Sequence, residues 1–310
     1  MDRRLILHIG HPKTGTTTLQ KLVFPRLSHV AYFDRDLTPA SAQIVSAFMN
    51  SPGLWRLRGD SILGQLRAEM RDRKTEGSAL VSAASMSTHR IFSPWASDNH
   101  WRDPFLLAAH LRECQAVAQR ADFDGVKVII GIRRQDQYLG SRYATYGWLT
   151  EAPGQDDFER QTLEIIDPEK RYFLDGVWLD YKTTHELIAD VVGERNVLLL
   201  PLERLADEPS RYFSALFAFL GEPLNPNIPD LGREKVRGIA PDVWTLKGKL
   251  MTRAARRKRF GRLRAILVRD SEIHLSPELK ENILSVYRAS NQSLTSRLNL
   301  DLARYGYCGE

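Results

Sequence analysis

Cysteine, long apolar runs and repeated segments are all scarce in this sequence of 310 residues. The two cysteines, Cys114 and Cys308, are far apart and lack metal-binding spacing, which argues against a disulfide framework or a zinc site and favours a reducing compartment. No run of eighteen apolar residues is present to span a bilayer. A predicted strand begins a few residues after Met1, so we expect no signal peptide and a cytoplasmic protein.

Acidic residues are absent from residues 247–264, which contain nine lysines and arginines. The net charge of the chain is +6, so the rest of the chain is slightly acidic and the basicity is local. This distribution argues against a nucleic-acid partner. Leucine and alanine recur among these cations near helical spacing, so we expect a basic helical segment over residues 246–268. It either makes a peripheral contact with an anionic membrane or glycan, or is simply a solvated helix face.

Short apolar runs alternate with longer helical patterns along the chain. The runs predict buried strands at residues 5–9, 79–82, 126–132 and 197–200. The helical patterns cover residues 60–75, 99–120 and 180–192, and Ser276 followed by Pro277 marks another helix start. The alternation predicts one α/β domain over residues 1–310, with a central parallel sheet flanked by helices in three layers.

The alternation is interrupted over residues 147–177, which are polar and contain several prolines and glycines. A long insertion of this kind is more often functional than idle. We expect a lid or an acceptor-facing loop here; the alternative is a mobile surface excursion.

A loop rich in glycine, lysine and threonine follows the first predicted strand and precedes a helix. Backbone N–H groups at a helix start have no intrahelical acceptor, and the helix dipole favours negative charge there, so phosphate is the natural ligand. Gly10 and Gly15 have the interval of a nucleoside-triphosphate loop, but Thr16 stands where that loop has its lysine. This argues against a magnesium-bound triphosphate. The candidate phosphate-binding residues are Lys13, Thr14, Gly15, Thr16 and Thr17.

A second strand, turn and helix begins with residues 126–132. Arg133 follows the strand, and Ser141 lies about two turns into the helix. Ligands of open α/β sheets bind beyond the carboxyl ends of the strands, so both residues can face the same crevice as the first loop. An arginine can bind a phosphate through two hydrogen bonds, and a serine can donate a third.

The two segments together resemble sulfotransferases that use 3′-phosphoadenosine 5′-phosphosulfate (PAPS). His11-Pro12-Lys13-Thr14-Gly15-Thr16-Thr17 is similar to the 5′-phosphosulfate loop of that family. The interval from Arg133 to Ser141 is that of its 3′-phosphate site, and Arg133-Arg134-Gln135-Asp136 is like bacterial members that act on carbohydrates. The resemblance also implies a P-loop-like fold, and it extends to the basic loop containing Arg237 and Gly238, which touches the nucleotide in the family.

The resemblance implies transfer of a sulfuryl group from PAPS to a hydroxyl or amine of a carbohydrate or lipid-linked acceptor, leaving 3′-phosphoadenosine 5′-phosphate (PAP). It implies no metal, and Lys13 would neutralise the departing phosphate. The acceptor also needs a base. Ala84 stands where related carbohydrate sulfotransferases have a glutamate, which leaves His89 and His11 as candidates.

Two other functions remain open from the sequence. One is a nucleotide-binding protein that has lost catalysis, which the alanine at position 84 suggests. The other is an ATP-dependent kinase or NTPase, which the missing Gly-Lys-Ser/Thr sequence argues against.

Overall fold

The computed structural model describes residues 3–34, 38–75, 77–87, 91–92, 104–150, 152–170, 175–224, 238–246, 250–252, 265–267 and 270–309. Within this part of the chain, a sheet of five parallel strands has the order β2-β3-β1-β4-β5. The strands are β1 (Arg4–His8), β2 (Val30–Asp34), β3 (Ser78–Ser82), β4 (Gly125–Ile132) and β5 (Val197–Pro201). Because β1 is central, the loop that follows it lies between the ends of β3 and β4.

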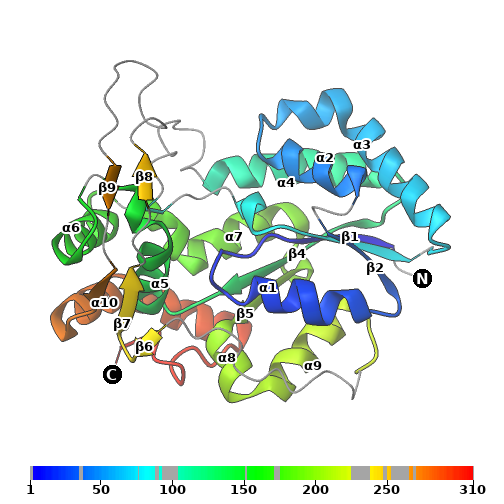
Figure 1. Cartoon of the computed structure of the whole chain (residues 1–310). Coiled ribbons are helices and arrows are strands. Elements are labelled where there is room, and N and C mark those ends of the chain that lie inside the picture. The colour runs from blue at the N-terminus through cyan, green and yellow to red at the C-terminus, as the bar shows by residue number, and fades with distance from the viewer. Residues whose placement is uncertain are drawn as a thin grey trace.

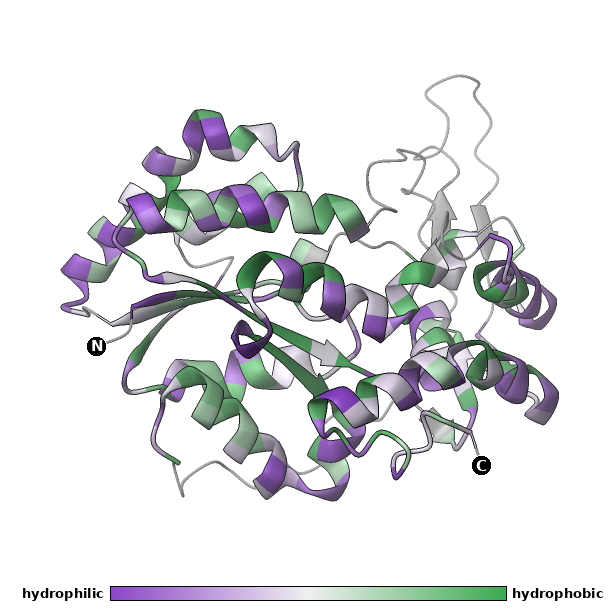
Figure 2. Ribbon diagram, turned by 180° about the vertical axis from the view of Figure 1, so that it is seen from behind, coloured by the Kyte–Doolittle hydropathy of each residue, from purple (hydrophilic) through white to green (hydrophobic). Residues whose placement is uncertain are grey.

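Helices cover both faces of this sheet (Figure 1). One face carries α2 (Pro39–Phe48), α3 (Gly53–Asp72), α4 (Pro104–Arg120) and α7 (Tyr181–Val192). The other carries a helical stretch made of α1 (Thr16–Thr18), a π-helical turn (Leu19–Val23) and a 3₁₀ turn (Phe24–Arg26), together with α8 (Leu202–Asp207) and α9 (Pro209–Leu220). Hydrophobic residues of the strands lie between these layers, and polar residues lie on the outer helix faces (Figure 2).

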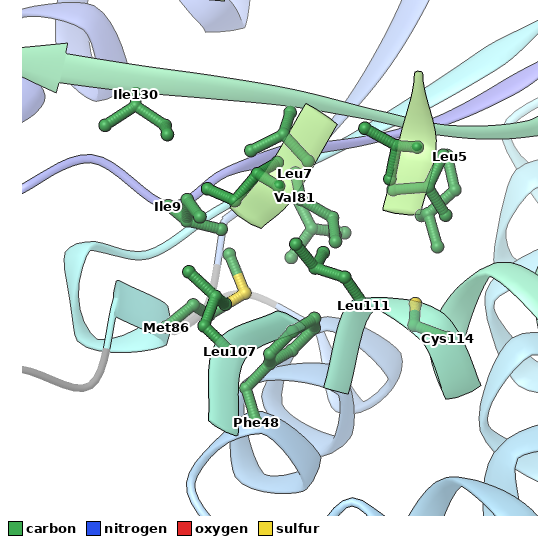
Figure 3. Close-up of a cluster of buried hydrophobic side chains, with 14 of the residues drawn as sticks. Leu5, Leu7, Ile9, Phe48, Val81, Met86, Leu107, Leu111, Cys114 and Ile130 are labelled. Carbon is green, nitrogen blue, oxygen red and sulfur yellow. The ribbon is translucent and has the colours of Figure 1, made fainter. Parts of the chain in front are cut away.

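The side chains of β1 alternate between the two faces, as strand geometry requires. Leu5 and Leu7 pack with Leu111 of α4 in the first core, part of which is drawn in Figure 3. Ile6 belongs to the second core, together with Phe24 of the helical stretch after β1. The sheet is thus buried on both sides, which explains the nearly continuous apolar runs of its strands.

A third core lies beyond the carboxyl ends of the parallel strands (Figure 1). It packs α5 (Gln135–Tyr146), α6 (Gln155–Ile166) and α10 (Pro277–Leu298) against an antiparallel sheet of order β10-β7-β6. The strands of this sheet are β6 (Gly238–Ala240), β7 (Val243–Leu246) and β10 (Ser271–His274). Trp244 of β7 packs so closely on Gly140 of α5 that a Cβ there would lie 2.4 Å from the indole ring. Gly140 therefore allows this sheet to pack against α5.

The structure confirms the four predicted parallel strands and the start of α10, where the Ser276 hydroxyl accepts a hydrogen bond from the Leu279 N–H at 3.1 Å.

The sequence did not predict edge strand β2. The chain entering β2 is held by the Glu222 carboxylate, which accepts hydrogen bonds from the backbone N–H groups of Ser28, His29 and Val30 at 3.0, 2.6 and 2.7 Å. An anchor 192 residues away in the chain leaves no local pattern in the sequence.

The helix predicted over residues 246–268 is wrong at its two ends. Residues 250–252 form β8 and residues 265–267 form β9, and these two strands pair in antiparallel fashion. The backbone groups of these residues form hydrogen bonds between strands rather than within a helix. All nine basic residues of 247–264 lie outside the described residues, so their contact with an anionic partner stays a prediction.

The segment 147–177 contains more regular structure than a loop. Its residues 155–166 form α6, whose Phe158 is fully buried in the third core, and Tyr143 of α5 donates a hydrogen bond to Asp157 at 2.7 Å. The role of the segment as a lid or acceptor-facing element stays a prediction. Among the described residues, no helix combines the length and the apolar character needed to cross a bilayer.

Buried histidines predict how stability depends on pH. Burial lowers the pKa of His110, packed against Phe48 at 5.4 Å between ring centroids, from 6.5 to about 4. The unfolded chain therefore binds a proton at higher pH than the folded one. The contribution of His110 to the unfolding free energy therefore has its full value above pH 6.5. As the pH falls towards 4, the unfolding free energy decreases by about 1.4 kcal/mol per pH unit.

His110→Phe should remove the part of the pH dependence of the unfolding free energy that is due to this histidine. Urea unfolding of the parent and the variant between about pH 7.5 and 5 measures the slope of the unfolding free energy. His274→Phe, the same substitution at an exposed position of β10, serves as the control. Equal slopes for the parent and His110→Phe would contradict the prediction.

Candidate functional site

The loop after β1 has the backbone shape of an anion site. Lys13 and Gly15 both adopt positive φ angles, 74° and 81°, and the Thr14 hydroxyl donates to the His11 carbonyl at 2.5 Å. Among the described residues, no side chain caps the helical stretch that begins at Thr16. The first N–H groups of a helix have no intrahelical acceptor, and the binding of an anion by these groups stays a prediction. Thr14 and Thr16 are buried, Lys13 and Gly15 are half-buried and Thr17 is exposed.

The loop packs directly on strand β4. A Cβ at Gly131 would lie 2.5 Å from the Thr14 Oγ1 and 3.1 Å from the Thr14 Cβ, and a Cβ at Gly10 would lie 3.0 Å from the Gly131 nitrogen. Both glycines are therefore needed for the close approach of loop and strand. Because Gly131 precedes Arg133 by two residues, this contact brings the two predicted motifs to one edge of the sheet.

His8 at the end of β1 was not predicted as a site residue. Its Nδ1 lies 2.7 Å from the Ser82 hydroxyl, which also accepts a hydrogen bond from the Gln20 amide at 3.0 Å. Either atom can be the donor, because the Ser82 hydroxyl can both donate and accept a hydrogen bond. The other ring nitrogen, Nε2, is buried without a hydrogen-bond partner among the described residues and lies 3.1 Å from the position of a Cβ on Gly10. Burial lowers the pKa of His8 to about 3, so it is neutral at pH 7.

Arg133 lies where β4 leads into α5. Its carbonyl accepts a hydrogen bond from the Tyr181 hydroxyl at 2.6 Å, which fixes the backbone at this point. Within the described ranges its guanidinium forms no hydrogen bond and no ion pair, and it remains available for an anion. Burial lowers the pKa of Arg133, while the nearby carboxylate of Glu203 acts in the opposite direction.

Glu203 connects the site to the end of the chain. It accepts hydrogen bonds from the backbone N–H of Arg134 at 3.0 Å and from the hydroxyl of Tyr307 at 2.6 Å. Arg134 itself is paired with Asp136, through contacts of 2.7 and 2.8 Å. Arg134 is thus committed to a structural pair, whereas Arg133 is not. The sequence reasoning missed Glu203 and Tyr307, which are distant in the chain and carry no motif.

Ser141 is buried on α5, and its hydroxyl forms no hydrogen bond with another described residue. Gly238 pairs with Trp244, and Trp244 packs on Gly140, the residue before Ser141. The structure therefore brings Gly238 to the same part of α5 as Ser141. Arg237 lies outside the described residues.

His11 lines the site from the loop side. Its ring contacts Tyr138 of α5 and Trp178 and Tyr181, with centroid distances of 6.0, 6.2 and 5.7 Å. Burial, with a smaller contribution from the positive charge of Arg142, lowers the pKa of His11 to about 3. His11 is therefore a neutral and weakly basic side chain at pH 7.

The chain after β3 continues the same edge of the sheet. The Ala83 N–H donates to the His8 carbonyl at 3.1 Å, and residues Ala84–Ser87 form a 3₁₀ turn. Ala84 thus lies at the end of the strand that adjoins β1, but it carries no group that can transfer a proton. His89 lies outside the described residues. Among those described, no three His, Cys, Asp or Glu side chains are grouped closely enough to hold a metal ion.

Comparison with known proteins relates this fold to sulfotransferases. No protein-family model and no curated protein matches the sequence. The structure is similar to a sulfotransferase from Alicyclobacillus acidocaldarius, with a TM-score of 0.51 and 14% identity over 98% of this chain and 99% of that chain. This similarity confirms the predicted P-loop-like α/β fold with a central parallel sheet.

Two further solved structures align less well. One is the sulfotransferase domain of the Synechococcus PCC 7002 olefin synthase, with a TM-score of 0.36 and 12% identity over 74% of this chain and 77% of that chain. The other is the sulfotransferase domain from the curacin biosynthetic pathway, with a TM-score of 0.40 and 12% identity over 73% and 76%.

Gly131→Ala tests the contact between the loop and β4. The added methyl group has no room beside Thr14, so we expect a loss of about 1–3 kcal/mol in the unfolding free energy. Gly64→Ala is the matched control, because nothing lies within 4 Å of the added Cβ on the exposed face of α3. It should stabilise the protein by about 0.5–1 kcal/mol. Urea unfolding measures both changes, and a neutral Gly131→Ala would show that loop and strand are not in tight contact.

Proposed function

We propose that this protein is a sulfotransferase that moves a sulfuryl group from PAPS to an acceptor hydroxyl or amine, with a carbohydrate or glycolipid acceptor favoured. The observation that carries the proposal is the contact between Thr14 and Gly131, which brings the Lys13 loop and Arg133 to adjacent strand ends. PAPS has two anionic groups, the 5′-phosphosulfate and the 3′-phosphate, and needs two such sites. The fold shared with the Alicyclobacillus acidocaldarius sulfotransferase supports the same proposal.

The donor would be held at these two sites. The loop N–H groups, Thr16 and Thr17 would bind the 5′-phosphosulfate, and Arg133 with Ser141 would bind the 3′-phosphate. Arginine suits this role because it stays protonated and offers paired donors to a phosphate. Arg237 and Gly238 would complete the nucleotide contact.

The chemistry is an in-line transfer. The bond between sulfur and the bridging oxygen breaks, its electron pair stays on the 5′-phosphate of PAP, and a new bond forms between sulfur and the acceptor atom. Lys13 would neutralise the charge that develops on the departing phosphate, which is the kind of electrostatic stabilisation that dominates related phosphoryl transfers. The proposal requires no metal for these steps.

The acceptor proton requires a base, and we assign that role to His89. A base works best when its pKa lies near the working pH, and the pKa of His11 is lowered to about 3 by burial. His11 then forms part of the wall of the site. Ala84 is compatible with this arrangement because it leaves the end of β3 without a competing carboxylate.

Lys13→Ala should reduce transfer by about a hundredfold or more, because charge on the leaving phosphate is no longer neutralised. The assay follows radiolabelled sulfate from PAPS into extracts of the source cell. Lys21→Ala, an exposed lysine on the same helical stretch, is the control and should retain activity. Unchanged turnover of Lys13→Ala would refute the mechanism.

Calorimetry separates the proposal from the two other functions. A PAPS-dependent enzyme binds PAP and not ATP with magnesium; the reverse preference would indicate a kinase or NTPase. A protein that binds PAP but transfers sulfate to no acceptor in the extract would be the catalytically impaired homologue.

The assignment of the base is tested by the pH dependence of the rate. His89→Ala should lose about 10²–10⁴-fold in rate and the acidic limb of the profile, since the proton acceptor is removed. His11→Ala should keep that limb, because its imidazole does not titrate near neutral pH. Retention of the parent rate and profile by His89→Ala would exclude this residue as the base.

A further inference from the structure

Arg142 on α5 is a buried cation with no acidic partner among the described residues. The residue is 4% exposed, and its Nε donates to the Ile91 carbonyl at 3.2 Å. The guanidinium lies over the ring of Tyr146, 3.9 Å from the centroid. Its buried Nη1 has no acceptor, and no carboxylate lies within ion-pair distance in the described part of the chain. A buried charge of this kind is costly to leave unpaired.

Other arginines of this region have polar partners. Arg134 is paired with Asp136, and Arg160 on α6 is paired with Asp157. Arg204 is also buried, and its Nε, like the Nη1 of Arg142, has no hydrogen-bond partner among the described residues. Arg142 instead contacts one carbonyl and one aromatic face, which orient the guanidinium without neutralising its charge.

Arg142 also has a defined place between two segments. Tyr138, one helical turn earlier on the same face of α5, contacts the His11 ring of the loop after β1. Ile91 belongs to the chain that follows β3 and its 3₁₀ turn. Arg142 therefore lies on the face of α5 that meets the loop after β1 through Tyr138, and its Nε contacts the chain after β3, on which an acceptor base is expected. Its influence on the pKa of His11 agrees with this position.

We propose that Arg142 binds a non-bridging oxygen of the sulfuryl group during its transfer. This inference rests on the proposed function and adds to it a contact for the sulfonate itself, separate from those for the two phosphates. The sulfur–oxygen bond to the 5′-phosphate breaks with its electron pair on the phosphate, the acceptor atom bonds to sulfur, and the acceptor proton passes to the base. Arg142 offsets negative charge on the sulfonate oxygens throughout this step.

PAP and PAPS together provide the test, because they differ by the sulfonate alone. Arg142→Met keeps an apolar side chain of similar length and removes the charge. We expect its affinity for PAP to stay within about threefold of the parent, whereas its affinity for PAPS should fall about tenfold to a hundredfold, the usual range for a lost hydrogen bond to a charged group. Transfer of radiolabelled sulfate should fall at least as much, and Arg142→Lys should recover part of it.

Stability distinguishes this role from a structural one. Removing an unpaired buried charge should leave the midpoint of urea unfolding unchanged or raise it, whereas loss of a structural tether to Ile91 would lower it and weaken PAP binding as well. Arg160→Met, an exposed arginine of α6, is the matched control. Equal loss of PAP and PAPS affinity, or an effect confined to the apparent affinity for the acceptor, would overturn the assignment. Failure of the parent protein to bind PAP would instead overturn the proposed function.

Discussion

The contact between the loop after β1 and strand β4 is the constraint on which the rest of the site depends. Gly131 has no side chain at the point where Thr14 packs, and Gly10 allows the loop to pass the same strand. Parallel pairing of β1 with β4 fixes the relative height of the two strand ends. The backbone of the loop and of β4 therefore places Lys13 and Arg133 at adjacent strand ends.

The polar groups around this contact fall into two kinds. Some are satisfied within the protein and set geometry, such as the Asp136 carboxylate paired with Arg134, and Glu203, which accepts from Tyr307. Others, Arg133 and Arg142, have no described acidic partner at hydrogen-bonding distance. Cations left unpaired at the end of a parallel sheet cost stability, and the anionic donor proposed above would offset that cost.

The sequence was most informative where the relevant interactions are local. The strand runs and the loop around Lys13 could be predicted because periodicity, glycine positions and helix starts are written in neighbouring residues. Edge strand β2, anchored by Glu222, and the pairing of β8 with β9 depend on contacts between distant segments. Arg142 was missed for a related reason: an arginine in a helix has no sequence signature for burial, and only packing against Tyr146 and Ile91 reveals it.

The connection between Glu203 and Tyr307 also has a consequence for biosynthesis. Tyr307, whose hydroxyl donates to Glu203 beside Arg133, lies 104 positions further along the chain than Glu203. The Asn291 side-chain amide holds Tyr307 in place by donating to its carbonyl at 2.8 Å. Tyr307 also belongs to the first core, together with Leu5 and Leu7 of β1. Both this face of the sheet and the surroundings of Arg133 are therefore finished only when the last residues of the chain have left the ribosome.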